Sequence, residues 1–549
     1  MYFYYSKTSN MKRRDFIASS AIAGISSTLA VSCRDAGTSN EVALSTKEAL
    51  PHFELDEESI SSLQEKMASG KYSSQQITRL YLDRIRVIDK SGPTLNSVIE
   101  INPDAMDIAK AMDDERKAGK LRGSMHGIPV MVKDNIDTND KMQTTAGSLA
   151  LEGHIASADA FVVKKLREAG AVIIGKTNLS EWANFRSPTS CSGWSSRGGQ
   201  TKCPYILDHN PCGSSSGSGV AVAANLCTVA VGTETDGSVT CPASVNAIVG
   251  LKPTVGLVSR SGIIPISATQ DTAGPMGRTV KDVAILLNAM TGIDTADTVT
   301  KQSEGRSHAD YTKFLDANSL QGKRIGIDKK PQGKNQYMAI LIKKAIDVLK
   351  QQGAQIVEVD YFEKISKIGE TEFDLMKYEF KDGLNKYLST ANAKVKTLAD
   401  VIAFNKANED KAMPFFKQET LEASDKKEGL DSKGYKETLE KCHKTSKRIL
   451  DEVIKQQKLD AICGLTMGPA CSIDLIYGDR WGEVFLTQPA ATSGYPHISV
   501  PCGLVYALPV GISFFGPAYS EGMLLSIAFA YEQATKNRLK PEFRKAFLV

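Results

Sequence analysis

Apolar residues recur at helical spacing from Leu55 to Lys90. They occupy every third or fourth position in two successive series, which is the spacing of a buried helix face: Ile60, Leu63, Met67, Ile77, Leu80, Tyr81 and Ile85. Ser73 and Ser74 lie between the two series, and serine is favoured at helix N-termini. The pattern predicts two amphipathic helices.

Short, β-branched apolar runs follow along the chain. IPVMVK (128–133), AVIIG (171–175) and TVAVGTE (228–234) are separated by helical stretches, and similar runs return as AICGL (461–465), HISVPCG (497–503) and VGISFFG (510–516). Strands that alternate with helices are typical of an α/β fold with helices on the faces of the sheet. Between about 300 and 460 the chain is charged and mostly helical, and its lysine-rich runs favour solvated helix faces over a binding patch.

The composition of the chain mainly excludes classes of protein and of binding site. The chain has 549 residues, of which 42% are apolar, and this excludes a disordered tail protein, a collagen-like fibre and a small disulfide module. Its 67 basic and 63 acidic residues are spread along the whole length, so no nucleic-acid partner is expected. The ten cysteines form no CxxC pair and the seven histidines no HExxH motif, so no metal site is expected. Buried positions are expected for the cysteines at 203, 212, 227, 241, 463 and 502.

The N-terminus resembles an export signal over residues 1–33. From Met11 a basic stretch is followed by a short apolar stretch of small residues and then by Cys33. The adjacent arginines, followed by Asp-Phe-Ile, resemble a twin-arginine signal, which implies export to a bacterial periplasm or envelope. AVSC resembles a lipoprotein processing site, with Ala30 where leucine is usual, so a lipid anchor at Cys33 is the only membrane attachment expected. An ordinary N-terminal anchor helix is the alternative.

Two further expectations concern the chain on either side of this signal. Residues 1–10 precede the expected start at Met11, and the polar residues 34–52 predict a linker to a body at 53–549. No run of about 20 uninterrupted apolar residues follows position 33, so the body is not expected to span a membrane.

The densest chemical signal lies between 126 and 260. HGIPVMVKDNID puts Lys133 at the end of an apolar run, PCGSSSGSGVAVAANL is a Gly/Ser loop that opens into a small-residue helix, and VGTETDGSVTCPAS puts Ser238 in a glycine-containing turn after a strand. A serine hydroxyl is a poor nucleophile until a neighbour takes its proton, and a lysine can do so only if burial keeps it neutral. Lys133 is such a candidate, a second serine could relay the proton, and the turn before Ser238 could direct backbone N–H groups at an oxyanion.

The Gly/Ser loop permits other interpretations. GSSSG (213–217) also matches the G-x-S-x-G nucleophile motif with Ser215 at its centre, although the loop DHNPC precedes it where that motif needs a hydrophobic strand. A phosphate-binding loop would need a Gly-Lys-Ser/Thr sequence that this stretch lacks. A purely structural loop is the default for a Gly/Ser run taken alone.

Together these segments resemble the amidase signature family of Ser-Ser-Lys hydrolases, over roughly residues 55–545. The resemblance rests on HGIPVMVKDN, AGAVIIGKTNLSEWA, PCGSSSGSG, GTETDGSVTCPAS, GLKPTVG and SGYPHISVP. It implies a single large α/β domain with a twisted mixed β-sheet covered by helices on both faces, and a cofactor-free amidase that forms a serine acyl-enzyme. The family's lysine falls on Lys133, its bridging serine on Ser214 and its acylated serine on Ser238.

The resemblance also implies supporting features of the site. These are a cis peptide bond before Ser214 and an oxyanion hole made by four backbone N–H groups, those of Thr235, Asp236, Gly237 and Ser238. Three residues stand where glycine is usual in the family, namely Cys212, Ser216 and Asp236. None of these differences removes a catalytic side chain of the family.

The substrate side of the site is expected in two places. Residues 300–460 are expected to shape the substrate cleft. In SEWANF, three residues fall where relatives have a pocket-lining loop, namely Trp182, Ala183 and Phe185. Ordinary core packing is the alternative for these three residues.

Within the family, two long segments are most similar to the bacterial peptide amidases, which remove the C-terminal amide of peptides: NFRSPTSCSGWSSRGGQTKCPY and GLKPTVGLVSRSGIIPISATQDTAGPM. We therefore expect a small amide or peptide-amide substrate, and no oligomeric state is predicted. One alternative is the A subunit of a tRNA-dependent amidotransferase, against which the export signal argues. Another is a non-catalytic peptide-binding lipoprotein, against which the complete lysine and serine set argues.

Overall fold

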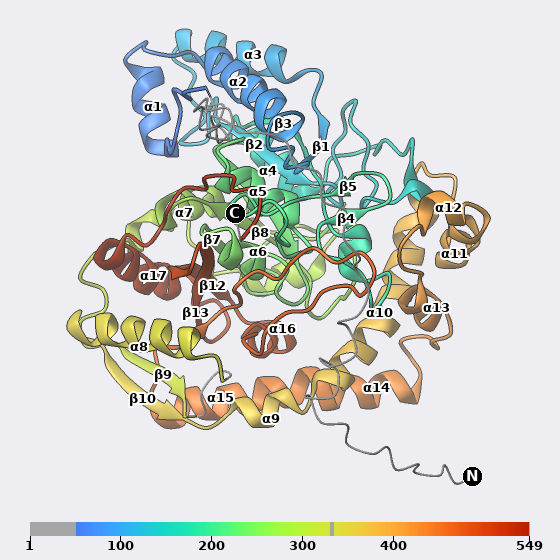
Figure 1. Ribbon diagram of the computed structural model, residues 1–549, viewed down its shortest axis with the longest axis vertical. Coiled ribbons are helices and arrows are strands. Elements are labelled where there is room, and N and C mark those ends of the chain that lie inside the picture. Colours follow the sequence, from blue (N-terminus) through green and yellow to red (C-terminus); the bar gives the residue numbers. More distant parts are fainter. Residues whose placement is uncertain (1–50, 330–333, 548–549) are drawn as a thin grey trace, which may run out of the picture. The chain divides into compact units, whose positions relative to one another are not determined.

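A computed structural model describes residues 51–329 and 334–547 of the chain (Figure 1). Its contacts divide the chain into Met1–His52 and Phe53–Val549, and the second unit is described below. The expected export signal, the expected start and most of the expected linker lie outside the described residues.

A mixed β-sheet of 11 strands forms the centre of this unit. From one edge to the other, the strands are β1 (Val98–Ile101), β3 (Val172–Thr177), β2 (Pro129–Lys133), β6 (Val229–Glu234), β8 (Thr272–Gly277), β7 (Val249–Lys252), β12 (His497–Val505), β13 (Leu508–Phe515), β11 (Ala461–Leu465), β9 (Arg324–Asp328) and β10 (Gln355–Val359). β2 pairs in parallel with β3 and β6, and β9 with β10 and β11, whereas the remaining pairs are antiparallel. A short ribbon of β4 (Trp194–Ser195) and β5 (Gly199–Gln200) is separate.

The two helices predicted near the start of the body are present as α1 (Ile60–Ala68) and α2 (Ser74–Arg84). Ser73 is the N-cap of α2: its hydroxyl accepts a hydrogen bond from the Gln76 N–H, and the Gln76 side chain accepts one from the Ser73 N–H. This reciprocal pair satisfies two N–H groups that a helix start leaves free. Ser74 is the first residue of the helix itself.

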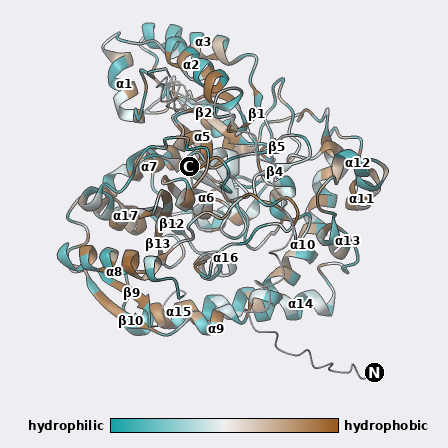
Figure 2. Ribbon diagram, in the orientation of Figure 1, coloured by the Kyte–Doolittle hydropathy of each residue, from teal (hydrophilic) through white to brown (hydrophobic). Residues whose placement is uncertain are grey.

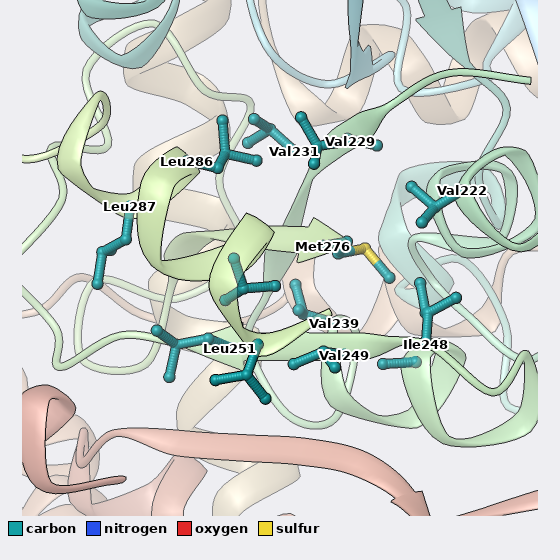
Figure 3. Packing of buried hydrophobic residues seen from close by; sticks show 14 of the residues in the cluster. Val222, Val229, Val231, Val239, Ile248, Val249, Leu251, Met276, Leu286 and Leu287 are labelled. Atoms are coloured by element: carbon teal, nitrogen blue, oxygen red, sulfur yellow. The ribbon is translucent and has the colours of Figure 1, made fainter. Parts of the chain in front are cut away.

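Helices flank the centre of the sheet and bury it. They are α3 (Ala105–Lys117), α4 (Phe161–Glu168), α5 (Ser216–Ala223), α6 (Thr240–Val245), α7 (Val280–Asn288), α16 (Gln488–Ser493) and α17 (Glu521–Thr535). Figure 3 shows side chains of α5, α7 and strands β6, β7 and β8 packed together, among them Val222, Val231, Leu251, Met276 and Leu286. The strands that carry the predicted site are therefore held in the largest apolar cluster of the fold.

The region from 300 to 460 is mostly helical, as predicted. Its helices are α8 (Gln336–Gln351), α9 (Phe362–Ser366), α10 (Gly369–Thr390), α11 (Leu398–Ala407), α12 (Glu409–Ala412), α13 (Glu419–Asp425), α14 (Lys433–Leu439) and α15 (Thr445–Gln457). Figure 2 shows α8 with both hydrophilic and hydrophobic residues, and its buried positions recur along one face. The prediction missed β9 and β10, which lie in this region and complete one edge of the sheet.

The remaining expectations about composition can be compared with the described ranges. The cysteines at 203, 212, 227, 241, 463 and 502 are buried, as expected. Among residues 51–329 and 334–547, none of the helices combines the length and the apolar character needed to cross a bilayer. In the same ranges, no three His, Cys, Asp or Glu side chains are grouped so that they could hold a metal ion.

Candidate active site

The topology of the sheet brings separate sequence motifs together at the C-terminal ends of two neighbouring strands. β2 ends at Lys133 and its parallel neighbour β6 ends at Glu234, so both strands end at the same side of the sheet. The turn that carries Ser238 follows β6 and leads into α6. Ser214 lies two residues before α5, which packs on β2 and β6. The Ser215 N–H donates a hydrogen bond of 3.1 Å to the Ser238 carbonyl and ties the two serine segments together.

The amine of Lys133 is fully buried among polar atoms. Its Nζ lies 2.7 Å from Ser214 Oγ, 2.8 Å from Thr233 Oγ1 and 3.2 Å from the Thr233 carbonyl oxygen. Asn135 Nδ2 donates a hydrogen bond of 3.0 Å to Thr233 Oγ1 and fixes that hydroxyl. The predicted lysine and the predicted bridging serine are therefore in direct contact.

Burial lowers the pKa of Lys133 to about 7, from an ordinary value of 10.5. The low-dielectric surroundings disfavour the ammonium form, and the nearby carboxylates of Asp271 and Glu234 partly oppose this effect by favouring it. Asp271 accepts hydrogen bonds from Thr235 Oγ1 and from the N–H groups of Ile266 and Ser267. Near neutral pH, a substantial fraction of the Lys133 amine is therefore uncharged.

The turn after β6 is shaped by one glycine and one carboxylate. Gly237 has a φ of +74°, and a Cβ there would lie only 2.9 Å from Cys241 Sγ, so a side chain would be both strained and crowded. Glu234 accepts hydrogen bonds from the N–H groups of Val239 (2.7 Å) and Thr240 (2.8 Å) and closes the turn. Ser238 lies between these two fixed points and is 8% exposed.

The four N–H groups predicted for an oxyanion hole are available. They belong to Thr235, Asp236, Gly237 and Ser238. In the part of the chain that the structure describes, none of these four N–H groups donates a hydrogen bond to another protein group. Unsatisfied N–H groups that follow one another in a turn can bind an anionic oxygen. The peptide bond between Gly213 and Ser214 is cis, as the family resemblance implied.

The Gly/Ser loop is glycine-rich because backbone segments meet there. A Cβ on Gly217 would lie 2.2 Å from the Ser97 carbonyl oxygen and 2.5 Å from that of Asn178. Ser215 is fully buried, and its hydroxyl donates to the Thr233 carbonyl (3.1 Å) and accepts from the Thr233 N–H (3.2 Å). Ser215 therefore joins α5 to β6, and this role argues against the G-x-S-x-G interpretation.

The proposed substrate-lining residues pack against the helical region. Trp182 and Phe185 are 1% and 3% exposed and lie in an apolar cluster with Phe380 and Leu384 of α10, whereas Ala183 is partly buried at its edge. Core packing thus accounts for the two aromatic rings, and a role of this loop in substrate binding stays a prediction.

A polar network behind the turn has no counterpart among the sequence predictions. Glu372 of α10 is buried and accepts hydrogen bonds from Gln270 Nε2 (2.9 Å) and Gln488 Nε2 (2.8 Å). Burial and the neighbouring Glu372 raise the pKa of Asp236 well above its usual range. Each of these residues comes from a different segment, so no local motif could have identified the network.

Comparison with known proteins places this fold and site in a class. The family model described as Amidase matches residues 76–525. A probable amidase of Arabidopsis thaliana is 41% identical over 92% of this chain and 94% of its own length. The crystal structure of the peptide amidase from Stenotrophomonas maltophilia superimposes with a TM-score of 0.85 at 47% identity, over 90% of this chain and 100% of that one. The A subunit of a glutamyl-tRNA(Gln) amidotransferase from Thermoanaerobacter pseudethanolicus is 33% identical over 89% of this chain and 99% of its own length.

These similarities and the mixed sheet define an amide-hydrolysing α/β enzyme. The chain belongs to the Amidase family.

The lowered pKa of Lys133 predicts a measurable cost in stability. Between about pH 7, the folded pKa, and pH 10.5, the unfolded value, the unfolded chain binds more protons than the folded one, so the free energy of unfolding rises with pH. Lys133→Met removes this penalty, at about 1.4 kcal/mol per pKa unit, less the hydrogen bonds lost. We expect the variant to be more stable than the parent by about 2–4 kcal/mol at pH 7 in urea unfolding, with a weaker pH dependence.

Lys176→Met is the matched control. Lys176 is equally buried, but its amine donates to the Ile136 carbonyl oxygen and to Thr144 Oγ1 close to the buried carboxylates of Asp134 and Asp137, and its removal takes away a positive charge that favours their ionised forms. This variant is expected to be less stable than the parent. A loss of stability in both variants would contradict the explanation for Lys133.

Proposed function

We propose that this amidase hydrolyses a small amide or a peptide C-terminal amide through an acyl-enzyme on Ser238, with Ser214 as the proton relay and Lys133 as the base. The observation that carries the proposal is the buried amine with a pKa of about 7 that lies 2.7 Å from the Ser214 hydroxyl. A base with a pKa close to the working pH combines a useful uncharged fraction with a useful affinity for the proton.

The surroundings of Lys133 fit a neutral amine. An uncharged amine has two N–H groups and one lone pair, and two oxygens of Thr233 lie within 2.8 and 3.2 Å to accept the two N–H groups. The lone pair then faces Ser214 Oγ, so the Ser214 hydroxyl donates to Lys133. Ser214 is thereby ready to receive a proton from the second serine as it loses its own.

The reaction follows from this arrangement. Lys133 takes the proton of Ser214, Ser214 takes the proton of Ser238, and Ser238 Oγ attacks the amide carbonyl carbon. The carbonyl oxygen gains the negative charge and is stabilised by the N–H groups of the 235–238 turn. The C–N bond breaks as the relay returns a proton to the nitrogen, ammonia or an amine leaves, and water hydrolyses the ester on Ser238 by the same relay.

The substrate class is supported by the similarity to peptide amidase. The second candidate, the A subunit of an amidotransferase, is supported by a lower identity and would act with partner proteins in the cytoplasm, which the N-terminal signal argues against. A non-catalytic peptide-binding lipoprotein would have no use for a buried, uncharged lysine in contact with a serine.

Ser238→Ala should abolish ammonia release from peptide amides while the unfolding midpoint stays within a few degrees of the parent. The parent should also transfer the acyl group from an amide to hydroxylamine, because an acyl-enzyme can be captured by an added nucleophile. Both are measured by ammonia release and hydroxamate formation. Turnover by Ser238→Ala would refute the assignment of the nucleophile.

The activity of the parent should fall as the pH drops below about 7, because protonation of Lys133 removes the base. The acid limb of kcat/KM should therefore follow one ionisation near pH 7. Lys133→Ala should lose at least about 100-fold in kcat, which is a typical contribution of a general base, and should lose this limb from any residual activity. A parent profile that stays flat down to pH 5 would contradict the role of Lys133.

We also propose that the protein is exported through the twin-arginine signal of residues 11–33 and, in its processed form, is anchored by a lipid on Cys33. The basic stretch, the short apolar stretch and the final cysteine support this localisation. Expressed at full length in a bacterium, the protein should be found in the envelope fraction. Replacing both arginines 13 and 14 by lysine should retain it in the cytoplasm, whereas Cys33→Ala should release it from membranes into the soluble periplasm. Cytoplasmic recovery of the unaltered chain would overturn the proposal.

A further inference from the structure

One large aromatic side chain beside the catalytic turn is open to solvent. Phe485 is 40% exposed, although the residues on either side of it, Val484 and Leu486, are 3% and 1% exposed. The backbone of Phe485 is fixed by an antiparallel bridge to Met467, and the Leu486 N–H donates a hydrogen bond of 3.0 Å to the Thr466 carbonyl. The ring is therefore held in place by its backbone while its face remains uncovered.

This ring contacts the turn that carries the proposed nucleophile. A Cβ on Gly237 would lie 3.4 Å from Phe485 Cζ and 3.1 Å from Thr487 Oγ1, so the segment 485–487 packs directly against that glycine. Gly237 immediately precedes Ser238 and supplies one of the N–H groups directed at an oxyanion. The exposed ring therefore lies beside the turn at which the substrate carbonyl is proposed to bind.

Other exposed apolar side chains of the same loop have no such position. Ile476 and Tyr477 are 80% and 65% exposed, and the guanidinium of Arg480 lies over one face of the Tyr477 ring, with its Cζ 4.7 Å from the ring centroid. An aromatic ring that is exposed to water lacks the favourable free energy of burial, and it gains this free energy when an apolar group covers it.

We propose that Phe485 determines substrate specificity by forming an apolar wall for the side chain of the residue that carries the amide. This inference rests on the proposed function and adds a substrate class to it: peptide amides whose C-terminal residue has a bulky apolar or aromatic side chain. Aromatic rings pack favourably against apolar and aromatic groups, whereas a glycine amide offers nothing to cover the ring.

The test compares two amides, N-acetyl-phenylalaninamide and N-acetyl-glycinamide, in the full-length parent and its variants. Phe485→Ala should lower kcat/KM for the phenylalanine amide about tenfold, mainly through a higher KM, and should change the value for the glycine amide by less than twofold. Tyr477→Ala, an exposed aromatic of the same loop, should change neither. Phe485→Leu should recover most of the loss, because it restores an apolar wall.

The unfolding midpoint of each variant shows whether the fold is intact. Equal losses for both amides, or no loss for either, with an unchanged midpoint would overturn the inference while ammonia release by the parent upholds the proposed function. If the parent releases ammonia from neither amide, the proposed function fails and the inference fails with it.

Discussion

The desolvation of one amine is the constraint on which the rest of the site depends. Lys133 ends a strand that is buried along its whole length, and its neutral form is useful only if a hydroxyl lies within hydrogen-bond distance. The parallel pairing of β2 with β6 supplies the surrounding oxygens of Thr233, and the packing of α5 on the same strands supplies Ser214. A surface lysine would keep its charge and could not act as this base. The large apolar cluster around β6, β7 and β8 therefore supports the proposed chemistry as well as the stability of the fold.

The carboxylates near the site set how far the pKa of Lys133 falls. Burial alone would lower the pKa of Lys133 further, and the charges of Asp271 and Glu234 oppose this decrease. Both carboxylates also accept hydrogen bonds from backbone N–H groups. Glu234 binds the start of α6, and Asp271 binds the loop at 266–267. Burial raises the pKa of Asp271, and the hydrogen bonds that it accepts from Thr235 and from the N–H groups of Ile266 and Ser267 partly oppose that rise. The same groups therefore shape the turn and limit the fall in the pKa of Lys133, the proposed base.

The apolar, β-branched runs of the sequence predicted β2, β3, β6, β11, β12 and β13, and the family resemblance assigned Lys133 and Ser214 from two separate motifs. The sequence patterns missed β8, TAGPMG, because its glycines allow a neighbouring strand to approach closely and give no apolar, β-branched run. A Cβ on Gly274 would lie 2.4 Å from the Leu251 carbonyl oxygen. The patterns missed β9 because RIGID is short, is charged at both ends and lies in a region whose composition favours helices. The contacts of Thr233 and Glu372 follow from tertiary structure, and no pattern within a single segment reports them.

One face of α10 connects the helical region to the loops of the candidate site. Glu372, Glu379 and Tyr387 lie about two helical turns apart, a spacing that places all three on the same side of the helix. Glu372 accepts from Gln270, Glu379 accepts from the Thr269 N–H, and the Tyr387 hydroxyl donates to Asp137 four residues after Lys133. The Gln270 side chain also donates a hydrogen bond of 3.4 Å to the Thr235 carbonyl, so the polar residues of α10 link this helix to the segments that carry the proposed nucleophile and base. A helix that only covered the sheet would need apolar residues at these positions, so α10 fixes the position of the outer helices relative to the proposed nucleophile and base.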